Sequence, residues 1–115
     1  MSVTIYHNPR CSKSRETLAI LESKQVETTV VEYLKSPPDA TELKRILDLL
    51  GISARELIRT GESPYKDLGL ADPEVPEASL IEAMVAHPIL IQRPIVISGN
   101  RAVIGRPPER VLDIL

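Results

Sequence analysis

The sequence contains neither Phe nor Trp, and its only aromatic residues are three Tyr. Aliphatic side chains must therefore fill the interior, and there is no set of aromatic side chains on which nucleic-acid bases could stack. No apolar run approaches the roughly 18 residues that a membrane-spanning helix needs. These absences argue against a nucleic-acid partner and against insertion into a membrane.

Cysteine occurs once, at Cys11, and histidine only at His7 and His87. One thiol cannot close a disulfide within the chain, and a structural zinc ion needs four ligands of these kinds, so we expect no bound metal. The first residues lack the basic-then-apolar layout of a signal peptide. Together these features predict a protein of the reducing cytoplasm.

Neither sign of charge dominates, because 14 Lys and Arg against 16 Asp and Glu leave a formal net charge of −2. Such a chain lacks the positive field that would draw it onto a nucleic-acid backbone or an anionic membrane surface. Its 115 residues match one small domain. We expect a monomer with one core.

The first third of the chain predicts a strand, a helix and a second strand. Alternating β-formers at Val3–Tyr6 predict the first strand, which ends before Pro9 because proline has no N–H for a neighbouring strand. A helix is expected from Cys11 to about Lys24, followed by a strand over residues 28–33. This order predicts two parallel strands joined by a right-handed crossover.

Helical signals fill a middle segment, about residues 39–88, which we expect to be a helical insert. Two of its helices begin with capping boxes, in which a side chain accepts a hydrogen bond from the backbone N–H three residues on. These boxes pair Asp39 with Glu42 and Ser53 with Glu56. Residues 64–73 are expected to be mostly turn, and a further helix is expected from Pro76 to His87.

The last third returns to strands. Residues 95–97 and 102–104 predict a hairpin closed by the Gly-Asn pair at 99–100, and a closing helix follows Pro107. The order βαβ, helical insert, ββα predicts a thioredoxin-like α/β fold, with a mixed sheet and helices on both faces. We therefore expect residues 1–115 to form a single thioredoxin-like domain.

Cys11 lies where the first strand gives way to the first helix. Unpaired N–H groups and the helix dipole favour a thiolate at such a position. His7 if protonated, Arg10 and Arg15 would act in the same direction, and Ser14 is close enough in sequence to donate a hydrogen bond to the sulfur. The alternative is a small buried hydrophobic residue, which is the commoner fate of a lone cysteine.

Three isolated Arg residues lie beside turns and prolines: Arg59, Arg93 before Pro94, and Arg106 after Gly105. Arg93 and Arg106 flank the predicted hairpin, so their guanidinium groups are expected to converge. Guanidinium groups suit tetrahedral oxyanions because they combine paired donors with a permanent charge. The alternative for any one of them is an exposed Arg on a solvated surface. The thioredoxin arrangement commonly has a cis bond before the proline at this point, although most X–Pro bonds are trans, so the state of Pro94 stays open.

Several segments, taken in order and covering essentially the whole chain, resemble the glutaredoxin-dependent bacterial arsenate reductases. They are His7–Arg15 (HNPRCSKSR), Gly51–Ser53 with Arg59, Pro64–Leu70 (PYKDLGL), His87–Val96 (HPILIQRPIV) and Gly105–Pro107 (GRP). Two differences stand out. Longer members carry a C-terminal tail beyond the position of Leu115, and some plasmid-borne members have Gly-Thr in place of Ser12-Lys13.

The resemblance implies an oxidoreductase of arsenic resistance that converts arsenate to arsenite through a covalent thiol–arsenate adduct. Glutathione is the implied co-substrate, glutaredoxin is the second external thiol, and no cofactor stays bound. The implied catalytic residues are Cys11, which forms the adduct, and His7 and Ser14, which tune its thiolate. The implied oxyanion-binding residues are Arg59, Arg93 and Arg106.

Two other functions stay open at this point. The fold is also similar to that of Spx-type regulators, which bind RNA polymerase and usually carry a Cys-x-x-Cys redox switch, whereas Ser14 occupies the second position here. A general glutaredoxin-class thiol oxidoreductase is the other alternative. Its disulfide substrates do not need three arginines around a tetrahedral oxyanion.

Overall fold

The computed structural model describes residues 2–115. They form two compact units, one made of residues 2–36 and 93–115 and the other of residues 37–92. None of the helices within residues 2–115 is long and apolar enough to cross a membrane.

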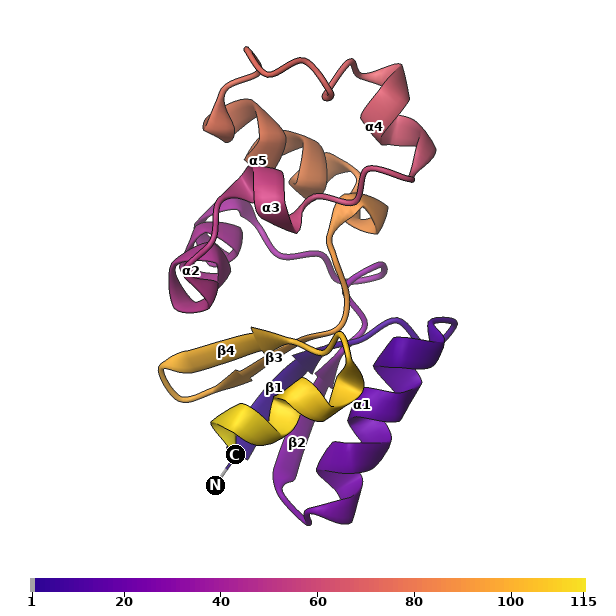
Figure 1. Ribbon diagram of the computed structural model, residues 1–115, viewed down its shortest axis with the longest axis vertical. Coiled ribbons are helices and arrows are strands. Elements are labelled where there is room, and N and C mark those ends of the chain that lie inside the picture. The colour runs from indigo at the N-terminus through magenta and orange to yellow at the C-terminus, as the bar shows by residue number, and fades with distance from the viewer. Residues whose placement is uncertain (1) are drawn as a thin grey trace. The chain divides into compact units, whose positions relative to one another are not determined.

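The first unit is a four-stranded sheet with two helical segments (Figure 1). Its elements are β1 (Ser2–Tyr6), α1 (Ser12–Ser23), β2 (Glu27–Val31), β3 (Ile95–Ser98), β4 (Arg101–Ile104) and the 3-10 helix η2 (Pro108–Ile114). The strand order is β2-β1-β3-β4; β1 is parallel to β2, while the β1–β3 and β3–β4 pairs are antiparallel. The predicted parallel pair and hairpin are both confirmed.

The core of this unit lies between the sheet and the two helical segments, which pack against each other on one face (Figure 1). Alternate residues of a strand share a face, so Val3 and Ile5 point into this core together. The buried cluster consists of Val3, Ile5, Leu21, Val96, Val103, Val111 and Ile114. The central strand β3 is buried at all four positions, as expected for a strand with apolar side chains on both faces.

The second unit is helical. Its elements are α2 (Ala40–Leu50), α3 (Ala54–Leu57), α4 (Ser63–Asp67), α5 (Glu77–Ala86) and the 3-10 helix η1 (Pro88–Leu90). Both expected caps are present: the Asp39 side chain accepts from the Glu42 N–H at 2.8 Å, and the Ser53 hydroxyl accepts from the Glu56 N–H at 3.3 Å. Gly51 ends α2 in the left-handed conformation, with φ of 69°.

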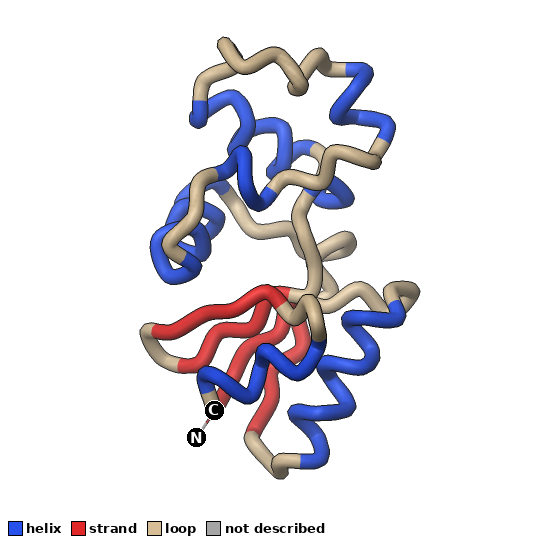
Figure 2. Tube along the Cα trace, viewed as in Figure 1, coloured by secondary structure: helices blue, strands red, loops and turns tan. Residues whose placement is uncertain are grey.

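The structure corrects two local expectations, one of which is the short helix α4, drawn in blue in Figure 2. Within residues 64–73, which were expected to be mostly turn, α4 forms because Pro64 falls in a first helical turn, where its missing N–H costs nothing. The second strand ends at Val31, and Tyr33 is buried in the turn that follows. The expected closing helix after Pro107 is present, and it is a 3-10 helix.

Candidate functional site

The loop between β1 and α1 fixes the position of Cys11. The N–H of Cys11 donates to the carbonyl oxygen of Asn8 at 3.0 Å, which closes a turn over Pro9 and Arg10. Cys11 is the N-cap residue of α1, in an extended conformation with φ of −96° and ψ of 123°. Ser or Asp commonly occupies this position and caps the helix with a side-chain oxygen. Within residues 2–115, no side chain makes a capping hydrogen bond to α1.

The surroundings of Cys11 favour its thiolate. Burial by itself raises the pKa of the Cys11 thiol, but the N–H of Ser14, the guanidinium of Arg93 and the N–H of Lys13 lower it, and the net pKa lies below its usual value. The residue is only partly buried. The buried-hydrophobe alternative is therefore wrong, and Cys11 has the environment of a reactive cysteine.

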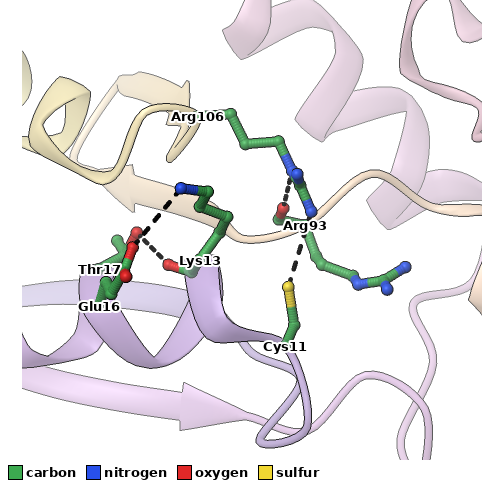
Figure 3. A network of polar contacts seen from close by, with 6 residues as sticks. All are labelled: Cys11, Lys13, Glu16, Thr17, Arg93 and Arg106. Carbon is green, nitrogen blue, oxygen red and sulfur yellow. Dashed lines mark hydrogen bonds and ion pairs between the residues drawn. The ribbon is translucent and has the colours of Figure 1, made fainter.

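Arg93 and Arg106 converge on the sulfur from the two ends of the β3–β4 hairpin. Nε of Arg106 donates to the carbonyl oxygen of Arg93 at 2.7 Å, and Nη2 of Arg106 lies 3.6 Å from Sγ of Cys11 (Figure 3). Arg106 thus makes the hydrogen bond to the sulfur, while Arg93 adds a second positive charge. The expected convergence of these two residues is confirmed.

Arg93 also has two hydrogen-bond donor atoms without a partner among the described residues. Its Nε and Nη1 atoms are buried and hydrogen bond to nothing within residues 2–115. Buried guanidinium nitrogens normally have partners, so donors of this kind are suited to the oxygens of an anionic ligand. The peptide bonds Arg93–Pro94 and Arg106–Pro107 are both cis.

His7 and Ser14 form a buried pair next to Cys11 in the chain. Nδ1 of His7 lies 2.6 Å from the Ser14 hydroxyl oxygen, and the two residues are 6% and 0% exposed. Burial lowers the pKa of His7, and Arg15 lowers it too, against an opposing effect of Glu32. His7 is therefore neutral near pH 7 and does not supply the positive charge that the sequence suggested.

The other basic residues named from the sequence have different surroundings. Arg15 donates to the carbonyl oxygen of Pro9 at 2.9 Å and so braces the turn before Cys11. Arg59 belongs to the second unit, where Nη1 donates to Gln92 at 2.9 Å and Nε lies 3.8 Å from a Glu62 oxygen. Its assignment to the oxyanion site stays a prediction.

Asn8 is the residue near Cys11 that sequence reasoning missed. It is 7% exposed and takes part in three hydrogen bonds of the loop. A signal was present, because Asn followed by Pro is typical of the first two positions of a β-turn. Within residues 2–115 there is no group of three or more His, Cys, Asp or Glu that could hold a metal ion.

The fold and the site together define a class of protein: thioredoxin-like domains with one activated cysteine at a helix N-terminus and two arginines beside it. The model of the ArsC family matches residues 6–114, and the chain belongs to that family. Relatives cover nearly the whole chain. The Escherichia coli (strain K12) protein named "Uncharacterized protein YfgD" is 56% identical and covers 98% of this chain and 96% of its own length.

An arsenate reductase of Haemophilus influenzae is 50% identical over the full length of both chains, at 100% coverage of each. The solved structure of an arsenate reductase from Vibrio cholerae superposes with a TM-score of 0.97 at 50% identity, covering 100% of this chain and 98% of that one. The thioredoxin-like fold predicted from the sequence is therefore confirmed.

Proposed function

We propose that this protein is an arsenate reductase whose Cys11 thiolate attacks the arsenic atom. The 3.6 Å contact between Arg106 and the Cys11 sulfur carries the proposal, because it joins a nucleophile to an oxyanion-binding group. Relatives about 50% identical over the whole chain bear the name arsenate reductase. The family and the site thus point to the same chemistry.

In the first step the Cys11 sulfur forms a bond to arsenic and an As–OH bond breaks. One proton is taken up, so that the departing oxygen leaves as water. The remaining oxygens bear negative charge, which Arg93 and Arg106 offset while the adduct forms. We assign the same role to Arg59, and we assign to His7 and Ser14 the tuning of the thiolate.

Reduction of arsenic needs two electrons, and the single cysteine of the chain cannot supply them by forming an internal disulfide. Glutathione displaces a second water and binds the arsenic of the adduct through its sulfur. Glutaredoxin then attacks that sulfur, forming a mixed disulfide and leaving the electron pair on arsenic. Hydrolysis releases arsenite and the Cys11 thiol, so arsenate and two thiols give arsenite, one disulfide and one water.

We place this reaction in the cytoplasm, because both external thiols are kept reduced there. The protein acts as a monomer, needs no bound cofactor and has no nucleic-acid partner. The lack of aromatic stacking groups and the balanced charge support the last point.

A coupled assay tests the proposal. Arsenate, glutathione and glutaredoxin are supplied together with glutathione reductase, and NADPH oxidation is followed with the wild-type protein and Cys11→Ser. We expect arsenate-dependent oxidation with the wild type and none above background with the variant. Equal rates for the two would reject enzymatic reduction. Turnover of a disulfide substrate without any response to arsenate would favour a general thiol oxidoreductase.

A further inference from the structure

We propose that Asn8 is a positioning residue, whose hydrogen bonds hold the turn that sets the Cys11 sulfur at the N-terminus of α1. This role goes beyond the residues assigned to the reaction above. Only its activity readout rests on the proposed function, because the state of the Cys11 thiol can be measured without arsenate.

The side chain of Asn8 makes the first of its contacts. Its Oδ1 atom accepts a hydrogen bond from the N–H of Arg10 at 3.0 Å. This contact is an Asx turn, in which a side-chain oxygen takes the place of a backbone carbonyl. Because Pro9 fixes its own φ, the two residues together leave the chain little freedom before Cys11.

The backbone of Asn8 makes two further contacts, one on each side of the turn. Its carbonyl oxygen accepts from the N–H of Cys11 at 3.0 Å, which closes the turn. Its N–H donates to the hydroxyl oxygen of Ser14 at 3.0 Å, which ties the turn to the first turn of α1. The loop is therefore anchored to the same helix whose N–H groups face the sulfur.

The hydroxyl group of Ser14 contacts both Asn8 and His7. One lone pair of the hydroxyl oxygen accepts from Asn8, and the oxygen also lies 2.6 Å from Nδ1 of His7. In the neutral tautomer whose Nδ1 carries no proton, Nδ1 of His7 accepts a hydrogen bond from the hydroxyl group of Ser14. In that tautomer, Ser14 acts on Cys11 through its backbone N–H while its side chain secures the loop.

The turn at Asn8 affects the position of the Cys11 sulfur. The hydrogen bond from the Cys11 N–H to Asn8 and the extended φ and ψ of Cys11 fix the direction of its Cα–Cβ bond, and so limit where the sulfur can lie relative to the helix N-terminus. Without the Asx turn, the turn would be held by fewer contacts and the sulfur would sample positions farther from the N–H groups of Lys13 and Ser14. The thiolate would lose stabilisation, while the two arginines on the hairpin would stay in place.

Three variants test this role. Asn8→Ala removes the acceptor, Asn8→Ser keeps a neutral oxygen that can form the same kind of turn, and Asn100→Ala is the matched control. Asn100 is the only other Asn of the chain and lies exposed in the turn between β3 and β4. Because Cys11 is the only cysteine, the pH dependence of alkylation by iodoacetamide reports its thiol directly.

We expect Asn8→Ala to raise the pKa of the Cys11 thiol by about 0.5 to 1, and Asn8→Ser to bring it back to within about 0.3 of the wild-type value. In the arsenate assay, Asn8→Ala lowers kcat by about 3- to 10-fold and changes the KM for arsenate by less than about 2-fold, because the arginines are untouched. Asn100→Ala changes neither quantity.

A lowered melting temperature of Asn8→Ala with an unchanged thiol pKa would overturn the proposal, because it would indicate a purely structural role. An Asn8→Ser thiol as perturbed as that of Asn8→Ala would overturn it as well. If Asn8→Ala does not fold, hydrogen exchange of the wild-type protein decides: the amides of Arg10 and Cys11 must be protected, and exchange at the rate of an open loop contradicts the proposal. Failure of arsenate turnover with these thiol results intact would count against the proposed function alone.

Discussion

Nη2 of Arg106 lies 3.6 Å from Sγ of Cys11, although the two residues are 95 positions apart in the sequence. The hydrogen bond from Nε of Arg106 to the carbonyl oxygen of Arg93 fixes the plane of the guanidinium group. The same group can therefore stabilise the resting thiolate and, after attack, the oxygens bound to arsenic.

Replacement of Arg106 should impair both roles. Arg106→Lys keeps the charge but loses the planar fork, so we expect the KM for arsenate to rise by about tenfold, in line with the loss of one charge-assisted hydrogen bond. The pKa of the Cys11 thiol should rise as well. The coupled assay and the alkylation profile measure the two effects, and Arg110→Ala is the control, since Arg110 is exposed on η2. An unchanged KM for arsenate would show that Arg106 does not bind the oxyanion.

Gly105 is needed for close packing and not for its backbone conformation, because its φ lies outside the left-handed region that favours glycine. A Cβ atom at this position would lie 2.5 Å from Oγ1 of Thr17 and 2.8 Å from Cγ of Pro94. Thr17 cannot move freely, because it is fully buried and its hydroxyl donates to the carbonyl oxygen of Lys13 at 2.8 Å. We expect Gly105→Ala to lower the free energy of unfolding by about 1 to 3 kcal/mol.

Urea unfolding followed by circular dichroism measures this loss, and Gly61→Ala is the matched control because a Cβ there would meet nothing within 4 Å. Equal stabilities of Gly105→Ala and the wild type would mean that Thr17 adjusts at no cost. In that case the contact between α1 and the end of β4 would not be a constraint on the fold.

Because His7 is buried, we expect the free energy of unfolding to decrease as the solution becomes acidic. Its pKa is lowered in the folded protein, mainly by burial, so the unfolded chain binds the proton more readily. The stability that neutral His7 contributes is complete above the unfolded pKa of about 6.5 and decreases as the pH falls below it, with a slope of at most about 1.4 kcal/mol per pH unit.

His7→Asn, which keeps a hydrogen-bonding group near Ser14, should lack this part of the pH dependence. Denaturant titrations between pH 7.5 and pH 5 measure it, with His87→Asn as the control at the exposed histidine. Identical profiles for His7→Asn and the wild type would show that His7 titrates alike in the folded and unfolded states.

The sequence predicted those parts of the site that depend on local signals. The strand, Pro9 and the helix that follows place Cys11 at a helix N-terminus whatever the rest of the chain does. Arg93 and Arg106 flank one hairpin, and antiparallel pairing brings the ends of a hairpin together. Both features can therefore be predicted from the sequence alone.

The remainder depends on contacts between segments that are distant in sequence. The crowding at Gly105 exists only because α1 brings Thr17 against it, and the neutral state of His7 follows from its burial. The role of Asn8 had a sequence signal in the Asn-Pro pair, but its bond to Ser14 depends on how the loop meets the helix. Burial and approach distances of this kind have no counterpart in composition or spacing.

The pKa of the Cys11 thiol in the wild-type protein tests the central claim most directly. The rate of alkylation by iodoacetamide, measured from pH 5 to pH 10, should follow a single titration with a midpoint below about 8.5, the value of an unperturbed thiol. A midpoint at or above that value would mean that helix terminus and arginines do not hold a thiolate, and would contradict the account.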